Sequence, residues 1–233
     1  MGAAIAAELA AMGMQVAVNY YQSRDSAERV CQSIRSAGGV ADAFCADVRD
    51  EKAIPQFVDS VRALYGEIDC LVVNATGPQP MLSIERQTWQ SYLDQLEFFV
   101  KSPLLLVQQV LTSMKAKGFG RIIQIGSEVV ELGNPNFANY VAAKGAQLGQ
   151  TRSWARELAP FGITVNLVAP GWIPTERHIA ATQQEMDAYA AGVPMQHMGT
   201  AEDVGKMVAY LCGDQARFIT GQKFAVNGGN TLL

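Results

Sequence analysis

The sequence lacks the features that would place it in a membrane or on nucleic acid. No apolar run in its 233 residues reaches the ~18 residues needed to span a bilayer. Its Lys and Arg residues do not cluster, and a formal net charge of −4 gives no general attraction to nucleic acid or to an anionic membrane surface. The alanine-rich start has no basic region and is interrupted by Glu8, unlike a signal peptide. We therefore expect neither a nucleic-acid partner nor a membrane partner.

Cysteine and histidine are also scarce. The cysteines lie far apart with no C-x-x-C pair, and the two histidines are too isolated to indicate a metal site. Cysteines spaced in this way are more typical of buried free thiols in a reducing compartment than of disulfides. We therefore expect no metal and a cytoplasmic location. The residues concerned are Cys31, Cys45, Cys70, Cys212, His178 and His197.

The sequence does have a regular alternation of β-rich runs and helical stretches. The run 70–75 is nearly all apolar, as expected of a parallel strand covered on both faces. Strands that alternate with helices predict βαβ units, and hence one doubly wound α/β domain over residues 1–233. The expected strands are 16–20, 40–48, 70–75, 121–127, 163–171 and 223–226. The expected helices are the start of the chain up to Gly13, then 25–37, 51–65, 88–117, 137–159 and 201–212, with a looser segment at 172–200.

The most informative residues are Ser127, Tyr140 and Lys144. Tyr140 and Lys144 are four apart in a predicted helix and so share one face. A tyrosine of ordinary pKa, about 10, is a poor acid at neutral pH, and a neighbouring ammonium lowers that pKa. Ser127 ends a predicted strand, where its hydroxyl could hold a carbonyl oxygen beside the phenol. The alternative is an exposed Tyr and Lys on a surface helix and a serine that makes a turn.

In this order and spacing the three residues resemble the short-chain dehydrogenase/reductase family, especially its 3-oxoacyl-[acyl-carrier-protein] reductase-like branch. The resemblance covers nearly the whole chain and includes "APGWIPT" at 169–175. It implies a Rossmann-type fold, and hydride transfer between a nicotinamide and a carbonyl or alcohol carbon. It implies that Tyr140 is the general acid/base, that Ser127 orients the substrate, and that Lys144 binds the nicotinamide ribose and lowers the pKa of Tyr140.

The resemblance also implies which residues hold the cofactor. Asp47 and Val48 match the pair that holds the adenine, although Asp47 could instead cap a helix. Asn74 and Ala75 lie at the carboxyl end of a predicted strand, where ligands of open α/β sheets bind. The other cofactor positions implied are Gly2, Pro170, Gly171, Ile173 and Thr175, together with Tyr140 and Lys144.

The choice between the two nicotinamide cofactors depends on the end of the strand 16–20. An acidic residue there would favour NAD by accepting both ribose hydroxyls. The sequence has Asn19 instead, with Arg24 nearby, and this combination tolerates a 2′-phosphate. We therefore expect NADP, while Arg24 could equally be a solvated residue at a helix start.

The chain departs from the family pattern at its beginning. The family has a strand and a T-G-x-x-x-G-x-G turn before the first helix, and only Gly2 matches that turn here. The first strand should lie between 16–20 and 70–75, so without it those two strands have unpaired edges or must close up. We expect either translation or cloning from an internal methionine, or a real truncation with a damaged cofactor site.

A second departure lies in the helix expected over 88–117. The asparagine that positions a relay water in the family falls near Phe99, and Lys101 or a backbone group could substitute for it. Phe98 and Phe99 could instead mark a helix-to-helix subunit interface, or pack in the core. We expect a homo-oligomer, either a dimer or a tetramer.

The segment 172–200 resembles the mobile substrate lid of the family. Its Met and aromatic residues suit an apolar substrate, or simply pack the lid onto the core. Glu128 and Glu131 are expected to be solvated rather than to point into the pocket. The lid residues are Trp172, His178, Met186, Tyr189, Met195, His197 and Met198.

The predicted function is NADP-dependent interconversion of a carbonyl and an alcohol, with a 3-oxoacyl thioester as one candidate substrate. The alternative is an impaired or non-enzymatic paralogue, or a truncated product, that acts by oligomerisation or ligand binding.

Overall fold

A computed structural model describes residues 1–175 and 181–232 of the chain. All the strand pairs in this part of the chain are parallel, and the β-rich runs of the sequence supply the strands. The strands are β1 (Gln15–Tyr20), β2 (Val40–Cys45), β3 (Cys70–Val73), β4 (Gly120–Ile125), β5 (Ile163–Pro170) and β6 (Lys223–Val226).

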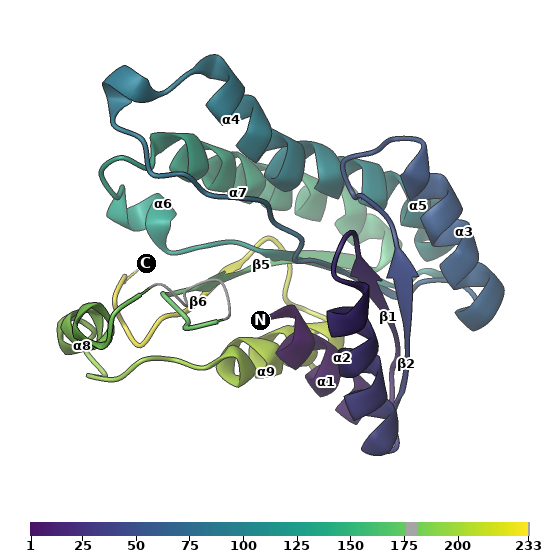
Figure 1. The fold of residues 1–233 in the computed structure, drawn as a ribbon. Helices are drawn as coiled ribbons and strands as arrows, with labels where there is room; N and C mark the ends of the chain where they lie inside the picture. The colour runs from purple at the N-terminus through teal and green to yellow at the C-terminus, as the bar shows by residue number, and fades with distance from the viewer. Residues whose placement is uncertain (176–180, 233) are drawn as a thin grey trace.

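Helices cover both faces of the strands, which confirms the doubly wound α/β architecture. Helices α1, α2 and α9 lie on one face, and α3, α4, α5 and α7 lie on the other (Figure 1). Their bounds are α1 (Gly2–Ala11), α2 (Arg24–Ser36), α3 (Ala53–Tyr65), α4 (Trp89–Leu96), α5 (Ser102–Lys117), α6 (Val129–Leu132), α7 (Ala138–Leu158), α8 (Gln183–Gly192) and α9 (Ala201–Cys212).

The strands form two separate hydrogen-bonded sheets within the described residues. In one sheet β1 pairs with β2, with Gln15 opposite Val40 and Tyr20 opposite Cys45. The other sheet has the order β3-β4-β5-β6. No hydrogen-bonded ladder joins β1 to β3. Of the two predicted outcomes, the strands therefore have unpaired edges and have not closed up against each other.

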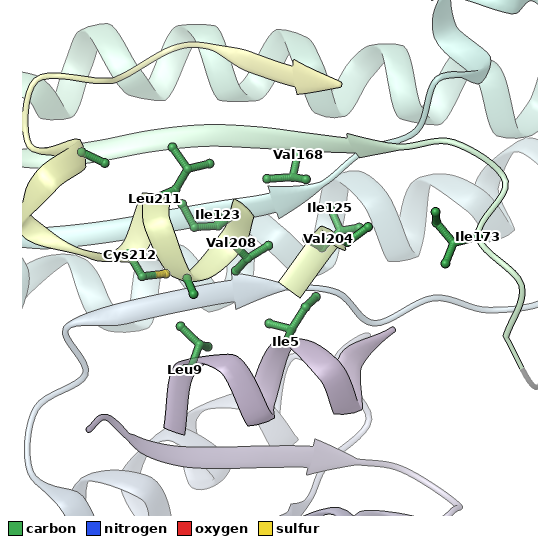
Figure 2. Close-up of a cluster of buried hydrophobic side chains, with 12 residues drawn as sticks. Ile5, Leu9, Ile123, Ile125, Val168, Ile173, Val204, Val208, Leu211 and Cys212 are labelled. Atoms are coloured by element: carbon green, nitrogen blue, oxygen red, sulfur yellow. The ribbon is translucent and has the colours of Figure 1, made fainter. Parts of the chain in front are cut away.

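Side chains from α1 and α9 connect the two sheets in place of a ladder. Figure 2 shows Ile5 and Leu9 of α1 pointing toward Val204, Val208 and Cys212 of α9, and all five are buried in one hydrophobic cluster. Strand β1 and strand β3 both pack side chains against this same cluster. Burial of apolar surface is not directional, so it holds the sheets together without backbone pairing.

Several element boundaries differ from those predicted. The helix expected over 88–117 is α4 and α5 joined by a π-helical turn at Glu97–Lys101. Strands β2 and β3 end two or three residues early, at Cys45 and Val73, so that residues 46–48 and 74–75 form loops. Helix α8 was not predicted, although Thr182 and Glu185 form a capping box, a T-x-x-E signal that marks a helix start.

The cysteines have no disulfide partners among the described residues. Cys31 and Cys212 are buried as predicted, but Cys45 is exposed, so that part of the prediction is wrong. Cys45 is the last residue of β2, where the sheet ends and solvent begins. In the described part of the chain no three metal-binding side chains come together, and no helix there is long and apolar enough to cross a membrane.

Candidate active site

The predicted site residues gather at one edge of the two sheets. Because all the strands run in parallel, their carboxyl ends meet at the same edge, where ligands of open α/β sheets bind. Asn19 lies near the end of β1, Asp47 follows β2 and Asn74 follows β3. Ser127 follows β4, and Pro170 ends β5. Residues from five strand ends thus surround one region of the molecule.

Tyr140 and Lys144 lie on α7, and Lys144 reaches the end of β4 that precedes Ser127. Tyr140 and Lys144 are buried on one face of α7, with 8% and 4% of their surfaces exposed. The Lys144 ammonium donates a hydrogen bond of 2.6 Å to the carbonyl of Ile125, two residues before Ser127. The same ammonium lies 5.7 Å from the centre of the Tyr140 ring. A surface position for Tyr140 and Lys144 is therefore ruled out.

Phe99 and Gln147 also contact the Lys144 ammonium. The ammonium lies 3.7 Å from the centre of the Phe99 ring and donates to Oε1 of Gln147 at 3.1 Å. The Phe99 ring also meets the edge of the Tyr140 ring, with 5.4 Å between centres. An aromatic face and two oxygen acceptors are partners that stabilise a buried ammonium. Phe99 is 2% exposed, so it packs in the core rather than marking a subunit interface.

Two contacts bring predicted cofactor residues close to one another. A Cβ atom on Gly2 would lie 2.8 Å from Nδ2 of Asn74, so the first turn of α1 closely approaches the end of β3. The backbone N–H groups of that turn lack intrahelical partners and form a site suited to phosphate. Val48 is buried in a cluster with Ala75 packed against it, which joins the loops after β2 and β3.

At the adenine end of the predicted site, the side chains of Asn19 and Asp47 already form hydrogen bonds within the protein. The side-chain amide of Asn19 donates to backbone carbonyls of β2 and its following loop, including Ala46 at 3.1 Å. The carboxylate of Asp47 accepts two hydrogen bonds from the Arg49 side chain, at 2.9 and 2.7 Å, and these lower the pKa of Asp47. Asp47 thus makes a local turn with Arg49 rather than capping a helix. Arg24 is exposed at the start of α2.

The loop after β5 packs against the end of β6. Gly171 donates its backbone N–H to the carbonyl of Val226 at 3.0 Å, and Ile173 is buried in the cluster that contains α1. Thr175 is half-buried at the end of this described stretch. His178, which was predicted to lie in the lid, falls outside the described residues, and His197 is exposed.

The predicted solvation of Glu128 is wrong. Glu128 is 4% exposed, because its carboxylate accepts hydrogen bonds from side chains of α8 and of the segment after β6. Glu131 is an exposed residue as predicted, but its carboxylate pairs with the Lys223 ammonium.

Comparisons with known proteins show the family to which the chain belongs. The family model described as "Enoyl-(Acyl carrier protein) reductase" matches residues 1–231. The chain is 37% identical to the 3-oxoacyl-[acyl-carrier-protein] reductase FabG of Staphylococcus epidermidis over 231 residues, which are 98% of this chain and 93% of the relative. The chain belongs to the short-chain dehydrogenase/reductase family. The protein is therefore an oxidoreductase.

Solved structures of short-chain dehydrogenase/reductases have the same fold. A mutant form of a Serratia marcescens short-chain dehydrogenase/reductase superimposes with a TM-score of 0.91 at 35% identity, over 99% of this chain and 93% of the other. A blue fluorescent protein from a metagenomic library, solved in complex with NADPH, superimposes with a TM-score of 0.89, also at 35% identity and with the same coverage.

Phe99 lies near the position where the resemblance to the family implies an asparagine. An aromatic ring lies against the ammonium where the resemblance implies an asparagine and a water. Lys101 does not replace them, because its ammonium pairs with Glu51 at 3.0 Å. Phe99 lies in the π-helical turn, and such turns are frequent at functional sites.

Sequence reasoning missed several residues of this region. Gln147 was missed although it lies three residues after Lys144 on the same helix, a spacing that brings side chains together. Tyr189 was predicted to lie in the lid, but its contact with Glu128, 61 positions away, has no signal in the sequence. Asn227 lies 99 positions after Glu128, and nothing in the sequence connects the two. For Glu128 itself, the available signal was its position directly after Ser127.

Proposed function

We propose that this short-chain dehydrogenase/reductase interconverts a ketone and an alcohol with NADP(H), with Tyr140 as general acid/base. The observation that carries the proposal is the Lys144 ammonium, which lies beside the Tyr140 ring and is bound to the carbonyl of Ile125. This contact brings the helical pair Tyr140 and Lys144 to the strand end that carries Ser127. This contact supports a single site for the three residue types needed for carbonyl protonation.

Each residue has a defined role in the proposed reaction. When bound, the nicotinamide cofactor supplies or accepts the hydride. Ser127 holds the carbonyl oxygen through its hydroxyl, and Tyr140 donates a proton to that oxygen during reduction. Lys144 stabilises the tyrosinate that remains, because a nearby positive charge favours the charged form of a phenol. The surrounding core excludes water, which strengthens this interaction.

The residues present fit nicotinamide adenine dinucleotide phosphate. The first turn of α1, with Gly2, Asn74 and Ala75 beside it, would hold the phosphates, and Asp47 and Val48 would line the adenine site. Pro170, Gly171, Ile173 and Thr175 would contact the nicotinamide, and Lys144 its ribose.

The 2′-phosphate is the group that separates NADP from NAD. The relevant strand end has the uncharged Asn19 and, close in sequence, the exposed cation Arg24. These features and the NADPH held by the metagenomic relative support NADP. NADP(H) is therefore the cofactor.

The substrate is proposed to be a ketone, and 3-oxoacyl thioesters are the first candidates because FabG relatives carry that name. Residues 172–200, including α8, would form the cover over the substrate. The four free cysteines fit a reducing compartment such as the cytoplasm, and a homodimer or homotetramer is the proposed assembly.

Binding without turnover is the second candidate function. It is favoured by the absence of a ladder between β1 and β3 in the described residues, and by the Phe99 ring against Lys144. A protein of this kind would bind NADPH but reduce no ketone in a panel that includes 3-oxoacyl thioesters.

The central experiment compares wild-type protein with Tyr140→Phe. Removal of the Tyr140 hydroxyl should lower the rate of ketone reduction by about 10²- to 10⁴-fold, the usual contribution of a general acid to the rate. NADPH binding, measured by nicotinamide fluorescence, should stay nearly unchanged. Tyr210→Phe, at a tyrosine that is 46% exposed, serves as the control. Full turnover by Tyr140→Phe would refute the assignment of the acid.

The cofactor preference has a separate test. Arg24→Glu should weaken binding of NADPH and leave binding of NADH unchanged, because only NADPH carries the 2′-phosphate. Equal NADPH affinity in wild type and variant would remove Arg24 from the cofactor site. No binding of either cofactor by the wild-type protein would eliminate both candidate functions.

A further inference from the structure

A buried carboxylate lies directly after Ser127. Oε1 of Glu128 accepts a hydrogen bond of 2.7 Å from the hydroxyl of Tyr189, and Oε2 accepts from Nδ2 of Asn227 at 3.0 Å and of Asn230 at 3.1 Å. No Lys or Arg among the described residues forms an ion pair with Glu128. A buried carboxylate is tolerated only with such hydrogen bonds, so each donor is held firmly.

Tyr189 connects this carboxylate to the loop after β5. Its hydroxyl donates to Glu128 and accepts a hydrogen bond of 2.9 Å from the backbone N–H of Trp172. Its ring packs edge-to-face on the Trp172 ring, with 5.3 Å between centres. A Cβ atom on Gly171 would lie 2.7 Å from the Tyr189 hydroxyl, so glycine is required there. Burial and the adjacent Glu128 raise the pKa of Tyr189, so the phenol remains a donor.

The segment after β6 joins the same network from the other side. Asn227 and Asn230 bind Glu128, and the carbonyl of Gly228 accepts a hydrogen bond of 3.1 Å from Met195, just beyond α8. A Cβ atom on Gly228 would lie 2.5 Å from the Val193 side chain. In Figure 1 α8 lies beside the carboxyl end of β6 and the C-terminus.

We propose that Glu128 is a positioning residue that fixes α8 and Trp172 relative to Ser127, and so sets the geometry of the carbonyl pocket. This inference rests on the proposed function, because it takes α8 as part of the substrate cover. The Glu128 carboxylate binds donors from α8 and from the segment after β6, and the Tyr189 hydroxyl connects it to the loop after β5. Glu128 lies one residue from the proposed carbonyl-binding hydroxyl. Because α8 contains no buried residue, hydrogen bonds to Glu128 hold this helix in place rather than a large apolar interface.

The test replaces one carboxylate oxygen with a donor. Glu128→Gln keeps the side-chain volume but cannot accept from all three partners, so the KM for a neutral ketone should rise about tenfold, the usual effect of losing a charged hydrogen bond. The kcat should change by less than about twofold, because Tyr140 and Lys144 are untouched. Tyr189→Phe should reproduce the rise in KM, and the double variant should add little to it.

Glu131→Gln is the matched control, since it removes a carboxylate from the same turn and leaves Lys223 without its ion-pair partner. It should lower the thermal midpoint without changing KM. A KM in Glu128→Gln no higher than in Glu131→Gln, or a loss confined to kcat, would overturn the proposal.

A second measurement does not depend on activity. Amide hydrogen exchange of Gln183–Gly192 should be faster in Glu128→Gln and Tyr189→Phe than in wild type or Glu131→Gln, with α9 as the internal reference. Unchanged exchange in α8 would refute the positioning role even if the protein reduced no ketone. If Glu128→Gln fails to fold, Tyr189→Phe supplies both measurements, because it leaves the Asn227 and Asn230 contacts in place.

Discussion

Phe99 illustrates how one residue changes the chemistry expected of a helix. The Lys144 ammonium lies on its ring at 3.7 Å and is otherwise held by a backbone carbonyl and by Gln147. A cation on an aromatic face away from water is stabilised by about 2 kcal/mol. The Phe99 ring therefore helps to keep the Lys144 ammonium beside Tyr140, although a phenyl ring cannot itself donate or accept a proton.

Phe99→Leu tests this contribution at the residue scale. Leucine keeps most of the volume but has no aromatic face, so the ammonium is held less firmly and the nearby phenol keeps its proton more tightly. Alcohol oxidation needs the phenolate, so the rising limb of its pH–rate profile should move to higher pH, with about tenfold lower activity at neutral pH. Phe99→Tyr keeps the face and should retain the wild-type profile. Identical profiles for all three proteins would show that the ring does not act on Lys144.

At the scale of elements, α8 and α9 begin with the same device and differ in burial. Thr182 and Thr200 each form a capping box with an acidic residue three positions later. Helix α9 then buries Val204, Val208 and Leu211 in the central cluster, whereas α8 has no buried residue. The two caps therefore have unequal effects on the stability of the whole protein.

Thr200→Ala should lower the free energy of unfolding by about 1 kcal/mol, because the cap stabilises a helix that unfolds with the core. Thr182→Ala removes the same hydrogen bonds from α8, and its loss should be smaller, since that helix can fray locally. Urea unfolding of the two variants measures both effects. Equal losses would mean that α8 unfolds only with the rest of the molecule.

At the scale of the whole molecule, side-chain packing replaces a missing ladder. The β1-β2 sheet and the β3-β4-β5-β6 sheet share no hydrogen-bonded pair in the described residues, and the cluster around α1 and α9 connects them. Strands β4 and β5 are buried at every residue, whereas β1 has none buried. The stability of the β1-β2 unit thus depends on α1.

Leu9→Ala should lower the free energy of unfolding by about 2–5 kcal/mol, through lost burial and the cavity that remains. Exchange of backbone amides should increase in β1 and β2 more than in β4 and β5, because the variant weakens the contact between the sheets. Leu64→Ala, at a residue that is 57% exposed, should change stability by less than about 0.5 kcal/mol. A uniform increase in exchange across all strands would show that the two sheets unfold together.

Much of the fold and of the candidate site could be predicted from the sequence. Apolar runs separated by helical stretches identified the strands, since a buried parallel strand must be apolar on both faces. Ser127, Tyr140 and Lys144 were found because their order and spacing resemble the short-chain dehydrogenase/reductase family, and because helical geometry places Tyr140 and Lys144 on one face. Helix α8 was missed because its sequence has a cap but no buried side to reveal it.

The order of most elements and the parallel topology followed from periodicity and spacing in the sequence, and the proposed acid and its cation followed from the resemblance to the family. The burial of Glu128, the contact of Phe99 with Lys144 and the lack of pairing between β1 and β3 are visible only in the folded protein. Each of these depends on partners from distant segments. Whether a carboxylate is buried or solvated is set by the donors that surround it, and those donors are known only once the chain has folded.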